Sequence, residues 1–259
     1  MTFSIPLDTL QYGFVLGGLG AHSSRTIMLH ELTLLLAACP PSGLSANYAA
    51  AVVEENVLLK RTESTRRKSL RYLRELYGLD TRLVLWRALR DLWEPEQRAQ
   101  PTLALLCALA RDPSLRATAT LVLQAERGAE LTSEDFATSM NLTKERSLNP
   151  ATIAKIGRNA ASSWTQSSHL QGRTHKVRVK AQSHPTSVAY ALLLGYLCGS
   201  RGEALFSTGW AQLLDAPPHT LHEQAFLAAQ RGWLEYRHAG TVTEIGFSHL
   251  LRKDPIQNE

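Results

Sequence analysis

The sequence predicts a mainly α-helical protein, in which a helical N-terminal bundle is followed by winged-helix-like modules with short β-hairpins. Apolar residues at helical spacing dominate residues 20–128. Beyond this region, helical segments lead into alternating segments that contain turn residues, and this order occurs twice. We therefore divide the chain into a helical bundle with a basic helix at residues 1–128, a winged-helix-like module with a basic wing at residues 129–183, and a second such module at residues 184–259.

The first predicted helices come from apolar runs with recognisable ends. Residues 27–39 form an apolar helix that two prolines close, and Ser45 is a suitable N-cap for a second helix that reaches residue 59. Two more helices are predicted at residues 82–93 and 102–111. Together these segments indicate an all-helical bundle.

A strongly basic helix, KRTESTRRKSLRYLRELYG, occupies residues 60–78. Ser64 or Thr65 can cap its N-terminus, and Gly78 can end it. Helical spacing gathers leucines on one side and arginines on a neighbouring side. The apolar side comprises Leu70, Leu73, Leu76 and Tyr77, and the basic side comprises Arg67, Arg71 and Arg74 with Lys68 at its edge. The helix can therefore bury one flank and still present a ridge of arginines.

The first predicted wing follows helices at residues 132–140 and 149–166. In the segment HLQGRTHKVRVKAQ, Gly172 can turn a hairpin, and the residues after it alternate strictly between basic and apolar. This alternation predicts cations on one face of the strand and valines on the other. The cations are Lys176, Arg178 and Lys180, and the valines are Val177 and Val179. The alternative interpretation is an edge strand that lysines protect from aggregation.

The second module repeats the order of helices followed by a hairpin. Helices are predicted at residues 187–198, 210–214 and 221–231, and the segment WLEYRHAGTVTEIGF then turns at Ala239 and Gly240. Its wing has no cationic excess, because Arg237 is accompanied by Glu235 and Glu244. We expect this module to support the fold or to bind protein.

The positive charge is concentrated in two islands. Residues 60–74 hold seven cations and one acid, and residues 155–180 hold six cations and no acid, whereas the whole chain has a net charge of only +5. Basic helix faces in solvent usually interleave Glu at i, i+4, but only Glu63 and Glu75 lie near these arginines. Two such islands favour nucleic-acid binding. The predicted DNA-binding residues are Lys60, Arg61, Arg66, Arg67, Lys68, Arg71, Arg74, Lys155, Arg158, Arg173, Lys176, Arg178 and Lys180.

The residues do not form a recognisable catalytic or metal-binding motif. The sequence has no P-loop, nucleophile elbow, zincin helix or deaminase signature. Glu54 and Glu55 are adjacent on a predicted helix and cannot jointly chelate a metal without partners from elsewhere, so we expect them to pair with Lys60, with Arg61 or with the side of a neighbouring helix. Four histidines fit polar surfaces or a wing better than a metal cage: His169, His175, His219 and His222. We expect no enzymatic activity, no metal and no cofactor.

Membrane insertion and secretion are not expected. The apolar stretches at residues 102–110 and 188–199 are shorter than the roughly 20 residues that cross a bilayer. The N-terminal residues have no basic segment before their apolar part, so they are a poor secretion signal. The three cysteines form no metal or disulfide spacing, which is typical of free thiols in a reducing cytoplasm. We predict a cytoplasmic protein.

The segment VVEENVLLKRTESTRRKSLRYLRELYGLD resembles the BrxA family of BREX phage-defence systems, in which an EEN segment followed by KR and a Ser/Thr-rich basic helix is typical. The resemblance covers about the first half of the chain. It extends to Glu54, Glu55, Asn56, Lys60, Arg61 and the arginines that follow. It implies a largely helical DNA-binding protein encoded beside a methyltransferase, a large ATPase and an alkaline-phosphatase-like protein.

These observations predict a double-stranded DNA-binding accessory or assembly protein of a bacterial antiviral defence system. The ridge around Arg67 is expected to lie along the phosphate backbone, and the wing around Arg178 to reach an adjacent groove or strand. Two alternatives remain open. One is a non-enzymatic adaptor whose C-terminal module docks a larger defence enzyme, and the other is a transcriptional regulator of the defence cluster.

Overall fold

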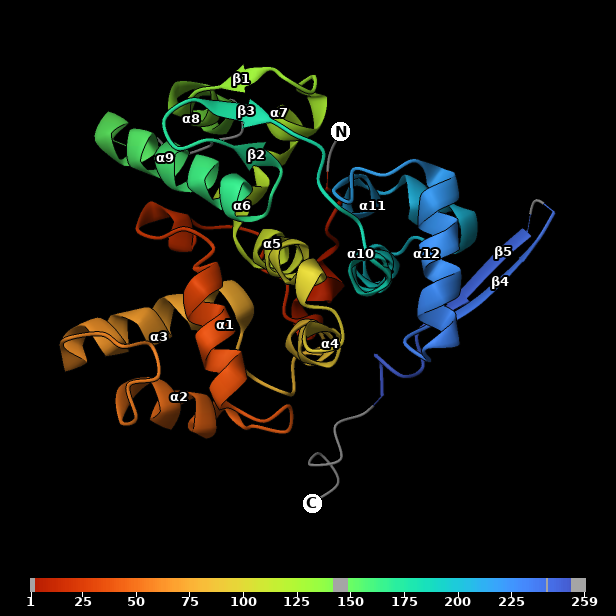
Figure 1. Ribbon diagram of the computed structural model, residues 1–259, viewed down its shortest axis with the longest axis horizontal. Helices are drawn as coiled ribbons and strands as arrows, with labels where there is room; N and C mark the ends of the chain where they lie inside the picture. The colour runs from red at the N-terminus through yellow and green to blue at the C-terminus, as the bar shows by residue number, and fades with distance from the viewer. Residues whose placement is uncertain (1–2, 142–148, 241, 253–259) are drawn as a thin grey trace.

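The computed structural model describes residues 3–141, 149–240 and 242–252 and is mainly helical, with a few short antiparallel strand pairs (Figure 1). The coarse fold class is therefore confirmed. No helix in the described part of the chain is both long enough and apolar enough to cross a membrane. The α-helices are α1 (Leu29–Ala38), α2 (Ser45–Val53), α3 (Glu63–Tyr77), α4 (Val84–Trp93), α5 (Gln100–Arg111), α6 (Pro113–Arg116), α7 (Ala119–Gln124), α8 (Ser133–Asn141), α9 (Pro150–Gln166), α10 (Pro185–Leu197), α11 (Gly209–Gln212) and α12 (Pro218–Gln230).

Helix α2 is shorter than predicted. It ends at Val53 instead of residue 59, because Asn56 and Leu59 have left-handed backbone conformations with φ of 55° and 54°. The Asn56 side chain accepts a hydrogen bond from the Lys60 N–H at 2.8 Å and holds this turn. Left-handed residues cannot continue a right-handed helix, so a defined loop separates α2 from the basic helix α3.

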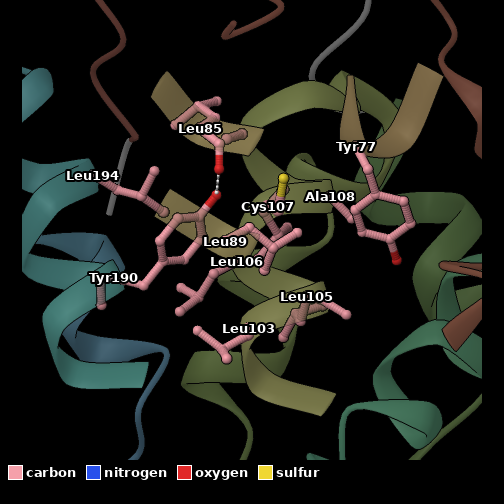
Figure 2. Close-up of a cluster of buried hydrophobic side chains, with 14 of the residues drawn as sticks. Tyr77, Leu85, Leu89, Leu103, Leu105, Leu106, Cys107, Ala108, Tyr190 and Leu194 are labelled. Atoms are coloured by element: carbon pink, nitrogen blue, oxygen red, sulfur yellow. Dashed lines mark hydrogen bonds between the residues drawn. The ribbon is translucent and has the colours of Figure 1, made fainter. Parts of the chain in front are cut away.

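Helix α5 lies at the centre of the core. All of residues 102–110 are buried, and α3, α4 and α10 pack around this helix. Figure 2 shows Tyr190 of α10 beside Leu89 and Leu106, with its hydroxyl donating to the Leu85 carbonyl oxygen at 2.9 Å. The N-terminal helices and α10 therefore share one hydrophobic core.

The first predicted wing is part of a small sheet. Strands β1 (Glu130–Leu131), β3 (Lys176–Arg178) and β2 (Leu170–Gln171) lie in that order and are antiparallel. The hairpin at Gly172 is confirmed: its φ is 105°, and an added Cβ would lie 1.9 Å from the His175 carbonyl oxygen. Because β3 has a partner on each side, the alternative of a protected edge strand is wrong for this strand.

The C-terminal part consists of α10, α11 and α12 followed by the hairpin of β4 (Glu235–Ala239) and β5 (Val242–Gly246). Glu235 pairs with Gly246 and Ala239 with Val242, so the predicted turn after Ala239 is confirmed. Helix α12 packs against α10 and contacts β4, and the short 3₁₀ helix η4 (Gly202–Ser207) packs against β5. The hairpin extends away from the helical core in Figure 1.

Candidate nucleic-acid interface

Helix α3 carries most of the predicted DNA-binding residues. Its N-cap is Thr62, whose hydroxyl oxygen accepts a hydrogen bond from Thr65 N at 3.2 Å, so the predicted caps Ser64 and Thr65 lie inside the helix. Gly78 ends the helix with a φ of 89°, as predicted. The amphipathic pattern is also confirmed, because the apolar flank of Leu70, Leu73, Leu76 and Tyr77 is buried.

Two contacts fix α3 to the rest of the molecule. The buried Tyr77 hydroxyl donates to the Ile27 carbonyl oxygen. At the C-terminal end, the Arg111 guanidinium of α5 donates to the carbonyl oxygens of Glu75 at 3.1 Å, Arg74 at 3.3 Å, and Gly13. The last carbonyls of a helix have no partner within it, so Arg111 supplies the missing donors. Helix α3 is thus held along its apolar flank and at its end.

The basic side of α3 faces solvent. Arg67 and Arg71 expose 67% and 61% of their side chains, and each lies one turn from an acid: Arg67 is 2.6 Å from Glu63 and Arg71 is 3.6 Å from Glu75. Such exposed i, i+4 pairs contribute only about 0.3 to 0.5 kcal/mol, so a phosphate can displace them. Three further exposed cations have no ion pair within the described residues: Arg61, Lys68 and Arg74. We call Arg61, Arg67, Lys68, Arg71 and Arg74 the α3 cation surface.

Two of the predicted DNA-binding residues, Lys60 and Arg66, lie outside the α3 cation surface. The Lys60 ammonium pairs with Glu31 of α1 at 2.9 Å, and both side chains are mostly covered. The expectation that Lys60 pairs with Glu54 or Glu55 is therefore wrong, because the left-handed turn after α2 directs the lysine toward α1. Arg66 is half-buried.

Two shallow hollows flank Arg67 and Arg71, which line both of them. One has a volume of about 480 Å³ and extends toward Val53 and Arg111, and the other has a volume of about 540 Å³ and extends toward Glu63. The surface is therefore concave on each side of these two arginines. A concave cationic surface brings several guanidinium groups to one chain of phosphates.

An aromatic group, Tyr72, lies beside the α3 cation surface. The guanidinium groups of Arg71 and Arg25 lie 4.6 Å and 5.2 Å from the centre of its ring. A hydrogen bond with the Ser24 side chain and the nearby Arg71 hold the pKa of the Tyr72 hydroxyl below its usual value. Arg25 was not predicted, because it is a single cation in an otherwise neutral stretch and only the fold brings it to α3.

The second basic island, residues 155–180, contains both buried and exposed cations. Arg178 is only 3% exposed, and its guanidinium donates to the carbonyl oxygens of Val122 at 2.9 Å and Val179, and pairs with Asp215 at 3.1 Å. The prediction that Arg178 faces outward is wrong. As β3 is the central strand, the face that carries Arg178 is covered by the chain around Val122 and Asp215. Arg178 stabilises the fold and does not reach a phosphate.

The other members of this island differ from one another. The Lys176 ammonium donates to the Thr165 hydroxyl at 3.0 Å, and partial burial lowers the pKa of this lysine. Four cations are exposed: Lys155, Arg158, Arg173 and Lys180. The first two belong to α9, which contacts the 3₁₀ helix η2 (Ala21–Ser23), and η2 also contacts α3. Figure 1 shows this short segment between α9 and α3, so the structure links the two basic helices through η2.

His169 is a core residue, and its predicted place on a polar surface is wrong. Its ring is fully buried, with Nε2 2.8 Å from the Leu213 carbonyl oxygen and Nδ1 3.0 Å from the Ser167 hydroxyl. Burial lowers the pKa of His169 to about 4. The ring is therefore neutral at physiological pH and serves packing.

A buried network joins His22 of η2 to Asp112 and Ser163. The His22 Nδ1 lies 2.7 Å from Asp112 Oδ2 and Nε2 lies 2.8 Å from Ser163 Oγ, which matches the order of a catalytic triad. All three side chains are buried, and Ser163 Oγ also accepts from Ile27 N and donates to the Asn159 carbonyl. Burial would raise the pKa of Asp112, but His22 and the Leu115 N–H outweigh it and lower this pKa. Because a substrate cannot reach Ser163, we assign the network to holding η2 against α6 and α9.

No protein-family model matches the chain. No curated protein matches it either.

Proposed function

We propose that this protein binds double-stranded DNA, mainly through phosphates, as a non-enzymatic accessory or assembly protein of a BREX-type bacterial phage-defence system. The observation that carries the proposal is the α3 cation surface: four exposed cations on α3 and Arg61 directly before it, of which only two form an ion pair within the described residues. Phosphate contacts need exposed cations and no base-reading groups, so this surface fits sequence-independent binding.

In the proposed complex α3 lies along the DNA backbone. The guanidinium groups of Arg67, Arg71 and Arg74 each offer a planar pair of donors to phosphate oxygens, which a lysine cannot. Tyr72 keeps Arg71 directed along this surface by its cation–π contact. The exposed Lys155 and Arg158 of α9 extend the contact to a neighbouring phosphate strand. Arg178 takes no part, because it is buried.

We further propose a winged-helix-like organisation for the two C-terminal modules. The order of α8, α9 and the β2–β3 hairpin, and of α10, α11, α12 and the β4–β5 hairpin, supports it. The assignment to a defence system rests on the resemblance to BrxA. It implies partners that include a methyltransferase, a large ATPase or an alkaline-phosphatase-like protein, and a cytoplasmic location.

A salt titration tests DNA binding directly. Five phosphate contacts from the α3 cation surface and two from Lys155 and Arg158 give an expected slope of roughly −6 for the logarithm of the association constant against the logarithm of salt concentration on duplex DNA. The measurement is fluorescence anisotropy on two unrelated duplexes, a single strand and an RNA hairpin. Similar affinity for both duplexes is expected. A slope near zero would contradict the proposal.

One observation favours the adaptor as a second candidate function. Phe226 and Leu227 of α12 expose 51% and 43% of their surface. Exposed large apolar side chains on one helix are typical of protein interfaces. When both are replaced by Ser, a defence-system protein should no longer co-purify with the chain, and the salt dependence of DNA binding should be unchanged. If co-purification persists with the doubly substituted chain, α12 is not the docking surface.

A further inference from the structure

Three potential metal ligands from separate elements meet at the C-terminal hairpin. They are Glu203 of η4, His222 of α12 and His238 of β4, and one ligand atom from each lies within 4.8 Å of the others. The His222 Nε2 and Glu203 Oε1 atoms are 3.1 Å apart. Two atoms bound to one tetrahedral ion at about 2.0 to 2.2 Å would be separated by roughly 3.3 to 3.5 Å. The first two ligands are thus already near the required distance, and a ring nitrogen of His238 lies within 4.8 Å of both.

A second set of residues orients these ligands. The Thr243 hydroxyl donates its one proton to Glu203 Oε2 at 2.5 Å and therefore accepts from His238 Nδ1 at 2.8 Å. With its proton on Nδ1, the His238 ring presents an unprotonated Nε2. The His222 Nδ1 lies 2.8 Å from the Tyr236 hydroxyl, which leaves Nε2 directed at Glu203. Metal-binding histidines typically hold their second nitrogen in such a hydrogen bond.

The backbone brings these elements unusually close together. Gly202, directly before Glu203, has a φ of 54°, and an added Cβ would lie 2.8 Å from the Thr243 carbonyl oxygen. Only glycine allows η4 to approach β5 at this distance. On the other side of the cluster, the ring of Phe206 stacks on His222 with centroids 3.8 Å apart. The packed backbone of α12, η4 and the hairpin thus sets the positions of the three ligands.

We propose that Glu203, His222 and His238 bind a zinc-class divalent transition-metal ion. Two imidazole nitrogens and one carboxylate oxygen suit Zn²⁺, whereas Mg²⁺ and Ca²⁺ prefer all-oxygen sites. The three ligands leave the fourth tetrahedral position to water. The ion ties the β4–β5 hairpin to α12 and η4, so it fixes the second wing to its module. The expectation of no metal site, and of His222 as a residue of a plain polar surface, overlooked this cluster because its ligands are separated by 16 or more positions in the sequence.

The test is a zinc titration of the full chain purified without a polyhistidine tag and dialysed against a chelator. Calorimetry should show one strong site, and the melting temperature should rise by about 5 to 10 °C at a Zn²⁺ concentration of about 100 times the dissociation constant. Glu203→Gln and His238→Ala should each weaken binding by at least about tenfold, and the matched control His249→Ala should not. The same titration with Mg²⁺ should give no heat.

A positioning variant separates metal binding from folding. Thr243→Val removes the hydroxyl that orients two ligands and leaves all three ligands in place, so Zn²⁺ affinity should fall by about 10- to 100-fold. The absorption spectrum of the Co²⁺-loaded wild-type chain should show the intense bands of tetrahedral coordination. This measurement needs no substitution, so it is independent of any folding defect in a variant. The proposal is overturned if the wild-type chain binds no Zn²⁺, or if the ligand variants bind it as tightly as the His249→Ala control.

Discussion

The two basic islands of this chain carry the same net charge in the sequence and differ in how much of it reaches solvent. On α3, four cations are exposed along one side and Arg61 is exposed directly before the helix, while the leucines of the other side are buried. In the second island Arg178 is buried against Asp215 and Lys176 is half-covered. The difference arises because a helix can bury one side and expose another along its whole length, whereas Arg178 lies on the central strand of its sheet, where its side chain is covered by the chain around Val122 and Asp215. Charge density in a sequence therefore locates a candidate surface only after the element that carries it is placed.

The largest expected effect concerns Arg178, the buried member of the second island. Arg178→Ala removes the closest ion-pair partner of the mostly covered Asp215 and the donor to several carbonyl groups, so the free energy of unfolding should fall by about 3 to 5 kcal/mol. Urea denaturation followed by circular dichroism measures this. Lys180→Ala, two residues away and exposed, is the matched control and should shift stability by no more than about 0.5 kcal/mol. Equal losses in the two variants would remove the distinction between buried and exposed cations in this island.

The exposed island should show the opposite behaviour. The double charge reversal Arg67→Glu with Arg71→Glu removes two phosphate contacts and adds repulsion, so duplex DNA affinity should fall on the order of 100-fold at physiological salt. The thermal midpoint should hardly change, because both side chains are exposed. The control reverses Arg98 and Arg231, which are exposed and lie outside α3. A control that loses as much affinity would show that net charge, not α3, governs binding.

The protonation of the buried His169 makes the free energy of unfolding depend on pH. Burial lowers the pKa of His169 from 6.5 to about 4, so between these values the unfolded chain binds a proton that the folded chain does not. The contribution of neutral His169 to the free energy of unfolding is complete above about pH 6.5. It decreases as the pH falls, by about 2 kcal/mol between about pH 7 and pH 5. Urea denaturation at several pH values measures it. His169→Gln should flatten this dependence, and an unchanged slope would show that other groups cause it.

The smallest effect tests whether α9 belongs to the interface. Lys155→Gln with Arg158→Gln should leave stability within about 0.5 kcal/mol of the wild type, because both side chains are exposed. If both contact phosphates, the magnitude of the salt slope should fall by about 1.8. An unchanged slope would confine the DNA surface to α3.

Local signals in the sequence were sufficient for α3. Its amphipathic spacing and Gly78 predicted its buried flank, its exposed arginines and its end. Local signals failed where a distant residue decides the outcome: Arg178 is buried because of Asp215, 37 positions later, and Lys60 turns to Glu31 because of the backbone at Asn56 and Leu59. The Glu203, His222 and His238 cluster was missed for the same reason, as no short motif joins its members. In each case, the sequence alone did not reveal which distant residue becomes a neighbour in the folded chain.

The position of Arg111 has an electrostatic consequence for any anion that approaches α3. The aligned peptide groups of a helix produce a macrodipole that places about half a negative charge at its C-terminal end. This end carries Arg74, and a phosphate arriving there would otherwise meet a repulsive field. The Arg111 guanidinium sits on the terminal carbonyl oxygens of Arg74 and Glu75 and supplies a compensating positive charge. Arg111 thereby offsets the negative end of the α3 dipole beside Arg74.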